Sequence, residues 1–101
     1  MWALLWDRGN LALAERYGVS REEVDAMFAL GEWTALPHRT RPEQVLLNGP
    51  TAPLPAGRLI ACAAEVRDTS AGRRFRPVVA KPAASWHEAA WRERHRHREV
   101  P

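Results

Sequence analysis

The chain is poor in cysteine, in lysine and in long apolar runs. Of its 101 residues one is cysteine, so no internal disulfide can form, and the apolar neighbours of Cys62 predict a buried structural thiol in a reducing compartment. The apolar run at residues 1–6 stops at Asp7, which makes it too short for a signal-peptide core or a membrane span. We therefore expect a cytoplasmic protein that has no membrane partner.

Several enzyme motifs are also missing from the sequence. It contains no phosphate-cradling glycine loop, no nucleophile elbow and no zinc signature. His87, His95 and His97 have no cysteine or paired carboxylate at ligand spacing, so we expect neither a metal ion nor a cofactor. His38, in a loop flanked by arginines, is interpreted as a surface residue.

Charge is present in quantity, and it is separated along the chain. Residues 1–33 contain three arginines and six acids, a net charge of −3. Residues 73–98 contain seven arginines and Lys81 against two glutamates, a net charge of +6. One basic half favours a polyanionic partner such as RNA or DNA. A sequence-specific DNA-binding domain is the weaker interpretation, because the helix expected after Ser20 is acidic.

Apolar periodicity and capping signals predict one α+β domain over residues 1–101. Ser20 and Glu23 form a capping box before an apolar stripe, and Gly31 ends that helix. Ser85 and Glu88 repeat the pattern and predict a C-terminal helix to about residue 98, with a basic tail at 92–101. The other expected elements are a strand at 2–6, a helix from about 11 to 18, a loop at 32–42, a strand at 43–47, an irregular connection at 48–57 and strands at 58–67 and 73–81.

Individual positions carry further expectations. Residues 68–72 predict a hairpin link, and Pro77, which lacks a backbone N–H, belongs at a sheet edge or a β-bulge. Trp86, Ala89 and Ala90 are the expected inner face of the last helix. Five tryptophans, each able to bury a large area, are expected in the core or at an interface: Trp2, Trp6, Trp33, Trp86 and Trp91.

Four short segments form an ordered series over most of the chain. They are Trp-Asp-Arg-Gly-Asn at residues 6–10, Glu-Arg-Tyr-Gly-Val-Ser at 15–20, Glu-Val at 23–24 and Arg-Pro-Val-Val-Ala-Lys at 76–81. Together they resemble the opening and the last strand of the BrnT-type toxins, a branch of the RelE-like ribonucleases of type II toxin–antitoxin systems. The chain differs at 48–50, where the family often reads Ile-Gly-Arg, and at Ala89, where an arginine is common.

The resemblance implies a fold, an activity and a partner. The implied fold is small and RelE-like, a compact antiparallel sheet with two N-terminal helices and a C-terminal helix, all on one side of the sheet. The implied activity is RNA cleavage, and the implied partner is a ribbon-helix-helix antitoxin that blocks the toxin. We expect either a dimer or a hetero-tetramer with this antitoxin.

Metal-independent RNA cleavage needs cations that hold the scissile phosphate and stabilise its added charge. Lys81, the sole lysine, stands at a matched position, and a bulge near Pro77 would bring Arg76 onto its face of the strand. Glu88 is the candidate base, although capping also explains it. The predicted catalytic residues are Lys81, Arg76 and Glu88, and the predicted RNA-binding residues are Arg74, Arg92, Arg94 and His87.

Two functions remain open at this point. The leading hypothesis is an endoribonuclease toxin that cleaves mRNA without a metal ion. The alternative is a catalytically weak or inactive member of the fold that acts as a protein-binding or RNA-binding module. For the cations themselves, a solvated strand face is the alternative to phosphate contact.

Overall fold

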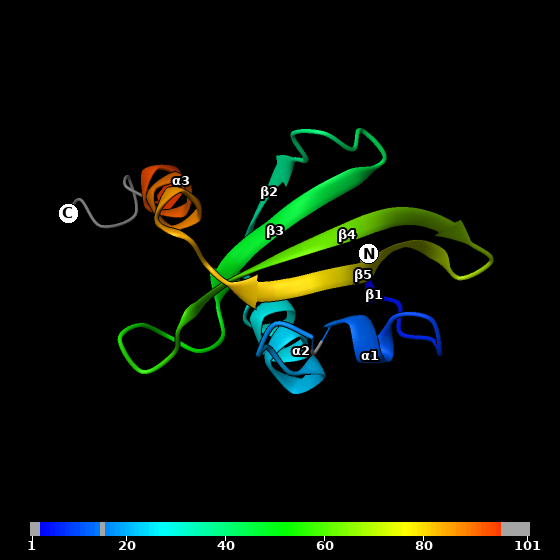
Figure 1. Ribbon diagram of the computed structural model, residues 1–101, viewed down its shortest axis with the longest axis horizontal. Helices are drawn as coiled ribbons and strands as arrows, with labels where there is room; N and C mark the ends of the chain where they lie inside the picture. The colour runs from blue at the N-terminus through cyan, green and yellow to red at the C-terminus, as the bar shows by residue number, and fades with distance from the viewer. Residues whose placement is uncertain (1–2, 15, 96–101) are drawn as a thin grey trace.

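The computed structural model describes residues 3–14 and 16–95. Its strands form one five-stranded sheet in the order β1-β5-β4-β3-β2 (Figure 1). The molecule is a small α+β domain, as the sequence predicts. In chain order the elements are β1 (Ala3–Leu4), α1 (Leu11–Ala14), α2 (Arg21–Leu30), β2 (Thr34–Pro37), β3 (Gln44–Pro50), β4 (Leu59–Thr69), β5 (Gly72–Pro82) and α3 (Ser85–His95).

The sheet is mixed, so the prediction of a purely antiparallel sheet is wrong. Strand β1 runs parallel to β5 and pairs with it at Arg74 and Phe75, while the other neighbours are antiparallel. Helix α1 is a single turn of four residues and not a helix that continues to Gly18. Within the described residues, the sheet therefore carries two helices of ten residues or more, α2 and α3, and one short helical turn.

Strand β2 lies inside the segment that the sequence predicted to be a loop. Its four residues pair with residues 45–48 of β3, and this pairing, not local propensity, makes the segment a strand. Strand β3 also continues to Pro50 instead of ending at Leu47. Gly49 permits a close approach there, because a Cβ at this position would lie 2.8 Å from the Cα of Trp33.

Strands β4 and β5 form the long hairpin that extends to one side in Figure 1. The hairpin is confirmed, but its link is the two residues 70–71 and not five. The register shifts inside it: Ala63 pairs with Val79, and Ala64 pairs with Pro77, so Val78 is an extra residue. The expectation that Pro77 lies at an edge or a bulge is confirmed.

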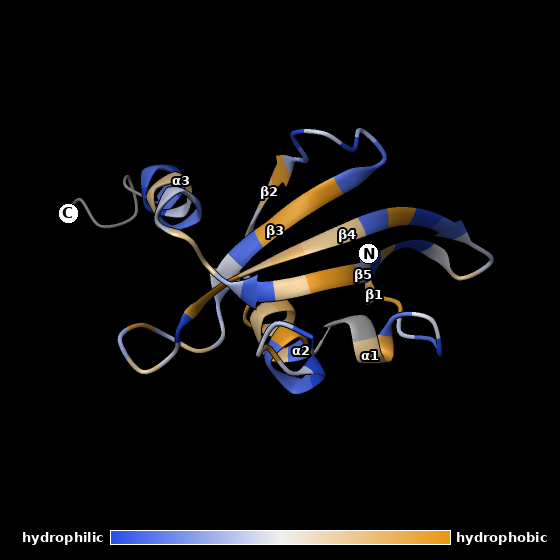
Figure 2. Ribbon diagram, in the orientation of Figure 1, coloured by the Kyte–Doolittle hydropathy of each residue, from blue (hydrophilic) through white to orange (hydrophobic). Residues whose placement is uncertain are grey.

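Helix α2 begins and ends where its capping signals predicted. The hydroxyl of Ser20 accepts a hydrogen bond from the backbone N–H of Glu23, whose carboxylate accepts one from the N–H of Ser20. Gly31 adopts φ 77°, the left-handed conformation that glycine tolerates. The helix buries Val24 and Met27 against the sheet, and Figure 2 shows the matching apolar residues along the middle of the strands.

The apolar core lies between α2 and one face of the sheet. Cys62 is fully buried there, as expected, and burial raises the pKa of its thiol to about 12, so it stays protonated and inert. Leu47 of β3 and Ala80 of β5 are its neighbours on the same face. Trp6 and Trp33 pack against this core, in agreement with prediction, while Trp2 lies outside the described residues.

Helix α3 borders the opposite face of the sheet, so the helices do not all lie on one side. The indole N–H of Trp91 donates a hydrogen bond of 2.7 Å to the carbonyl of Glu32 and anchors the helix to the α2–β2 connection. The buried residues of α3 are His87, Trp91 and His95, spaced four apart. The predicted inner face at Trp86, Ala89 and Ala90 is wrong, and Trp86 is exposed.

Candidate functional site

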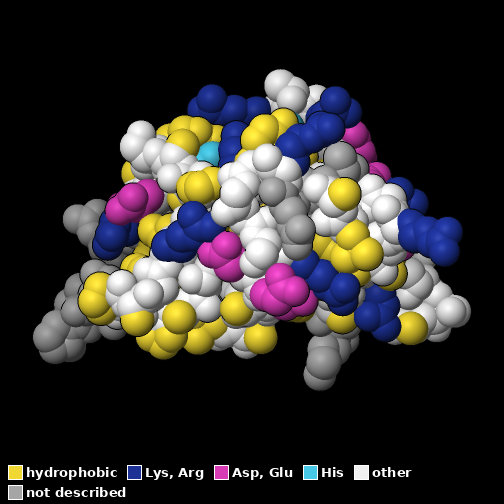
Figure 3. Space-filling view, turned by 60° about the horizontal axis from the view of Figure 1, so that its bottom comes forward, with side chains coloured by type: hydrophobic (Ala, Val, Ile, Leu, Met, Phe, Trp, Pro, Cys, Tyr) yellow, Lys and Arg dark blue, Asp and Glu magenta, His cyan; other side chains and the backbone are white. Residues whose placement is uncertain are grey.

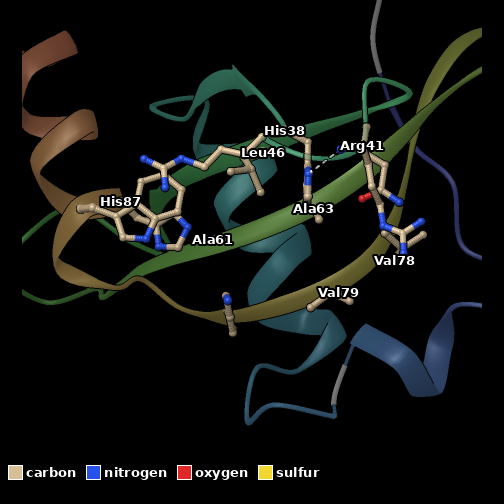
Figure 4. A pocket seen from close by; sticks show the side chains of 12 residues that line it. His38, Arg41, Leu46, Ala61, Ala63, Val78, Val79 and His87 are labelled. Carbon is tan, nitrogen blue, oxygen red and sulfur yellow. Dashed lines mark hydrogen bonds between the residues drawn. The ribbon is translucent and has the colours of Figure 1, made fainter.

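A pocket of about 420 Å³ opens on the face of the sheet opposite α2. Figure 4 shows His87 of α3 at one end, His38 and Arg41 of the β2–β3 loop at the other, and Ala61 and Ala63 of β4 between them. The small alanine side chains leave the space that the longer side chains surround. The lining residues are His38, Arg39, Arg41, Gln44, Leu46, Ala61, Ala63, Val78, Val79, Lys81, Trp86 and His87.

The charged residues of the pocket are all cationic. Arg39, Arg41 and Lys81 line it, and no carboxylate does. Arg41 has a carboxylate neighbour outside the lining, Glu43, at a nitrogen–oxygen distance of 4.0 Å. Among the described residues Lys81 has no ion-pair partner, and its side chain is exposed. A concave site with this charge attracts an anion.

The bulge in β5 decides which face Lys81 occupies. Beyond the bulge Lys81 pairs with Ala61, and before it Arg76 pairs with Glu65, two partners that lie on the same face of β4. Without the extra residue, the separation of five would place Lys81 and Arg76 on opposite faces. The structure thus brings both cations to the pocket side of the sheet, as the bulge near Pro77 allowed.

Arg76 is nonetheless separate from the pocket lining. Its guanidinium contacts Asp7 at 2.9 Å and Glu65 at 3.0 Å, and 17% of its side chain is exposed. The hydrogen bonds from Arg76 hold the pKa of the Asp7 carboxyl below its usual range. Arg76 is neutralised by two carboxylates, which does not suit the predicted phosphate contact.

The other predicted site residues are distributed over the molecule. Glu88 forms an i, i+4 ion pair with Arg92 at 3.0 Å and does not line the pocket. Arg94 is exposed on α3, and Arg74 lies near the far end of the hairpin, so neither contributes to the pocket. The basic tail beyond His95 lies outside the described residues. Of the predicted set, the structure brings together Lys81 and His87.

His87 occupies the position that the predicted capping box gave to Glu88. The helix starts one residue earlier than that pattern implies: the backbone N–H of Ala84 donates to Nδ1 of His87 at 2.9 Å. This bond assigns the ring proton of the neutral imidazole to Nε2. Burial, followed by the positive charge of Lys81, lowers the pKa of His87, which favours the neutral ring.

His38 is held in the same way at the other end of the pocket. Its Nδ1 accepts hydrogen bonds from the backbone N–H groups of Thr40 at 3.2 Å and Arg41 at 3.1 Å. The proton of the neutral ring is therefore again on Nε2. Each imidazole offers a hydrogen-bond donor, and the ring nitrogen that could accept a proton is occupied by backbone N–H.

Sequence reasoning missed the loop that closes the pocket. The sequence predicted His38 to be a surface residue, gave Arg39 and Arg41 no role beyond flanking it, and placed Trp86 on the inner face of the last helix. The available signal was the run of one histidine and two arginines between Pro37 and Pro42, where no acid intervenes. Its position over β4 and β5 depends on the β2–β3 pairing, which no local pattern revealed.

The separation of charge along the chain does not persist on the surface. Acids of the N-terminal region pair with arginines from later segments: Asp7 with Arg76, and Glu23 with Arg58 at 2.8 Å. On the face drawn in Figure 3, acidic side chains lie beside basic ones. The net charge of each half of the sequence therefore does not locate a polyanion site on the surface, whereas the pocket lining holds cations and no carboxylate.

Within residues 3–14 and 16–95, no three His, Cys, Asp and Glu side chains are arranged to hold a metal ion. No helix in this part of the chain is long and apolar enough to cross a membrane. No protein-family model matches the sequence, and no curated protein matches it.

Proposed function

We propose that this chain is a BrnT-like toxin of a type II toxin–antitoxin pair, with a RelE-like fold, which acts in the cytoplasm as a metal-independent endoribonuclease on mRNA. The observation that carries the proposal is the pocket itself. It combines three cations and two imidazole donors, has no carboxylate in its lining and includes the one lysine that the family resemblance matched. This is the chemistry that recognises a phosphodiester.

The pocket supplies what the cleavage of RNA requires on the phosphate. As the 2′-oxygen attacks phosphorus and the bond to the 5′-oxygen breaks, solvent water takes the proton of the 2′-hydroxyl and supplies one to the leaving 5′-oxygen, while negative charge accumulates on the phosphoryl oxygens. Lys81 lies beside His87 at one end of the pocket, where these oxygens would lie, and the Nε2–H group of His87 is the neutral donor there. Arg41 and His38 line the other end of the pocket, where a neighbouring phosphate of the strand would lie. In this proposal Arg76 and Glu88 stabilise the fold and take no part in the cleavage, because each already forms ion pairs. Arg76 pairs with Asp7 and Glu65, and Glu88 pairs with Arg92.

A second function is favoured by the two histidines. Both Nδ1 atoms accept backbone hydrogen bonds, so neither imidazole in this arrangement is free to take the proton of the 2′-hydroxyl. Such a site binds RNA and leaves it intact. The second candidate is therefore an RNA-binding module of the same fold.

The partner follows from the same charge argument. A ribbon-helix-helix antitoxin that blocks RNA would place acidic side chains over Arg39, Arg41 and Lys81, in a dimeric or hetero-tetrameric complex. Expression of the chain alone is expected to arrest growth, and co-expression of the product of the neighbouring gene is expected to restore it.

Lys81→Ala tests the proposal at its central residue. RNA cleavage is measured with purified protein and labelled RNA in EDTA, and binding is measured by anisotropy over a series of salt concentrations. Lys81→Ala should abolish cleavage, weaken binding of every RNA sequence and lower the slope of log K against log salt by about 1.

Arg67→Ala is the matched control, since it removes an exposed cation on the hairpin away from the pocket. It should leave cleavage and binding as in the parent protein. Binding that Lys81→Ala weakens, without cleavage by any variant, selects the RNA-binding module. Equal binding by the parent and Lys81→Ala contradicts both functions.

A further inference from the structure

Trp86 stands at the mouth of the pocket with its ring open to solvent. It is the second residue of α3, and it lies outside the buried face of that helix, which consists of His87, Trp91 and His95. Its side chain lines the pocket, yet Trp86 is 43% exposed. An indole is costly to leave in water when burial is available, so an exposed one beside cations favours a ligand with an aromatic face.

Two planar side chains accompany this indole. The guanidinium of Arg39 lies over the ring, with Cζ 5.1 Å from the ring centroid. The imidazole of His87 lies 3.7 Å from the indole, centroid to centroid, and is inclined by 32°. Arg39 comes from the β2–β3 loop and Trp86 from α3, so the pair spans the pocket opening between two elements.

We infer that Trp86 and Arg39 form a stacking site for one unpaired nucleobase, an inference that rests on the proposed RNA function of the same pocket. Bases of single-stranded RNA stack on aromatic rings and on guanidinium planes. The flanking phosphate lies toward Lys81, which lines the same end of the pocket as Trp86 and His87. A base inserted between the two planes displaces the Arg39 side chain, which is exposed and has no ion pair among the described residues.

The size of the pocket limits what can enter. A volume of about 420 Å³ is at the lower end of the range for small-ligand sites and suits one nucleotide. A base in a duplex is covered on both faces by its neighbours, so it cannot reach the ring of Trp86. The site therefore selects single-stranded over double-stranded RNA.

The test compares one labelled RNA strand, alone and in its duplex, by anisotropy at a fixed salt concentration. The parent protein should bind the single strand at least about 10-fold more tightly. Trp86→Ala should weaken single-strand binding by about 5- to 100-fold, the range of base–aromatic stacking, and leave duplex binding unchanged. Trp86→Phe, which keeps a stacking ring, should retain most of the affinity.

Arg39→Lys separates stacking from charge. It keeps the positive charge but loses the plane, so it should weaken single-strand binding without changing the salt slope. Tyr17→Ala is the control, because Tyr17 is 52% exposed and does not line the pocket. This variant should bind both RNA forms as the parent does.

The outcomes distinguish this inference from the function on which it depends. If Lys81→Ala weakens RNA binding but Trp86→Ala does not, the stacking site is overturned and the proposed function stands. Equal loss of single-strand and duplex binding in Trp86→Ala and Trp86→Phe also overturns it, since that pattern indicates a general disturbance of the pocket. Absence of RNA binding by the parent protein overturns the proposed function itself.

Discussion

Two buried asparagines show how differently the two ends of this sheet treat polar groups. Asn10 is 0% exposed, and its side chain accepts from the N–H of Asp7 and donates to the carbonyls of Leu5 and Pro77. Asn48 is 1% exposed, and neither its amide nitrogen nor its oxygen has a hydrogen-bond partner among the described residues. The side chain of Asn10 thus makes three hydrogen bonds within the fold, whereas that of Asn48 makes none among the described residues.

The cations near the two asparagines, Arg76 and Lys81, also differ in whether they have a partner. The edge network, which consists of Asp7, Asn10, Glu65, Arg76 and Pro77, pairs Arg76 with two carboxylates. In the pocket, Lys81 on the same strand has no such partner in the described part of the chain. The ion pairs and hydrogen bonds of the edge network hold β1, α1 and β5 together, whereas the ammonium group of Lys81 remains available to a ligand. Four measurements would break or sharpen this division.

Asn10→Ala is expected to have the largest effect on stability. It removes three hydrogen bonds and leaves the buried carbonyl of Pro77 without its donor. We expect the free energy of unfolding to fall by roughly 2–4 kcal/mol, measured by chemical denaturation. Asn10→Asp keeps the shape but not the donating amide, so it should be destabilising too. A loss below about 1 kcal/mol would show that the edge network does not carry the sheet edge.

Arg76→Ala should lower stability without touching RNA binding. It leaves the half-buried carboxylate of Glu65 without a partner on that side, at a cost of about 1–3 kcal/mol. RNA affinity measured by anisotropy should equal that of the parent, because Arg76 does not line the pocket. A large loss of RNA affinity with little change in stability would instead show that Arg76 contacts the RNA.

His87 should make stability depend on pH. Its pKa lies below the ordinary 6.5, so the unfolded chain takes up a proton that the folded chain resists. The contribution of His87 to the free energy of unfolding is then most favourable above about pH 6.5 and falls as the pH drops toward the pKa of His87 in the folded protein. His87→Gln, which can still accept from Ala84 but does not titrate, should show a flatter decline between about pH 7.5 and about pH 5.5 in denaturation midpoints. Equal slopes in the two proteins would contradict this assignment.

Asn48→Ala should have the smallest effect. It removes a buried amide that makes no hydrogen bond, so the gain from avoided desolvation offsets the small cavity, and stability should change by no more than about 1 kcal/mol. Denaturation of Asn48→Ala beside Asn10→Ala compares the two asparagines directly. Similar losses in both would remove the distinction between the edge network and the pocket side of the sheet.

Local signals in the sequence predicted the elements that local bonds stabilise. The capping box at Ser20 and the glycine at 31 located α2 correctly, because their partners lie within four residues. Strand β2 escaped prediction, since only its pairing with β3 makes it a strand. The start of α3 was misplaced by one residue because His87 takes the capping position that the pattern assigned to Glu88.

The residues of the candidate site likewise divide into those that the sequence identified and those that only the fold brings together. Lys81 and His87 were identified from the sequence as cationic or polar residues of the last strand and helix. His38, Arg39, Arg41 and Trp86 were not, because the loop and helix that carry them meet over β4 only in the folded sheet.

The sequence by itself determined the α+β composition, the capped helix α2, the β4–β5 hairpin and the burial of Cys62, all of which follow from short-range bonds and apolar spacing. Only the tertiary structure decided that a bulge at Val78 turns Lys81 toward the pocket, and that Arg76 is held by Asp7 and Glu65. The physical reason is that strand register and ion pairing join residues up to 69 positions apart. No local pattern fixes which cations of the chain will meet a carboxylate in the fold.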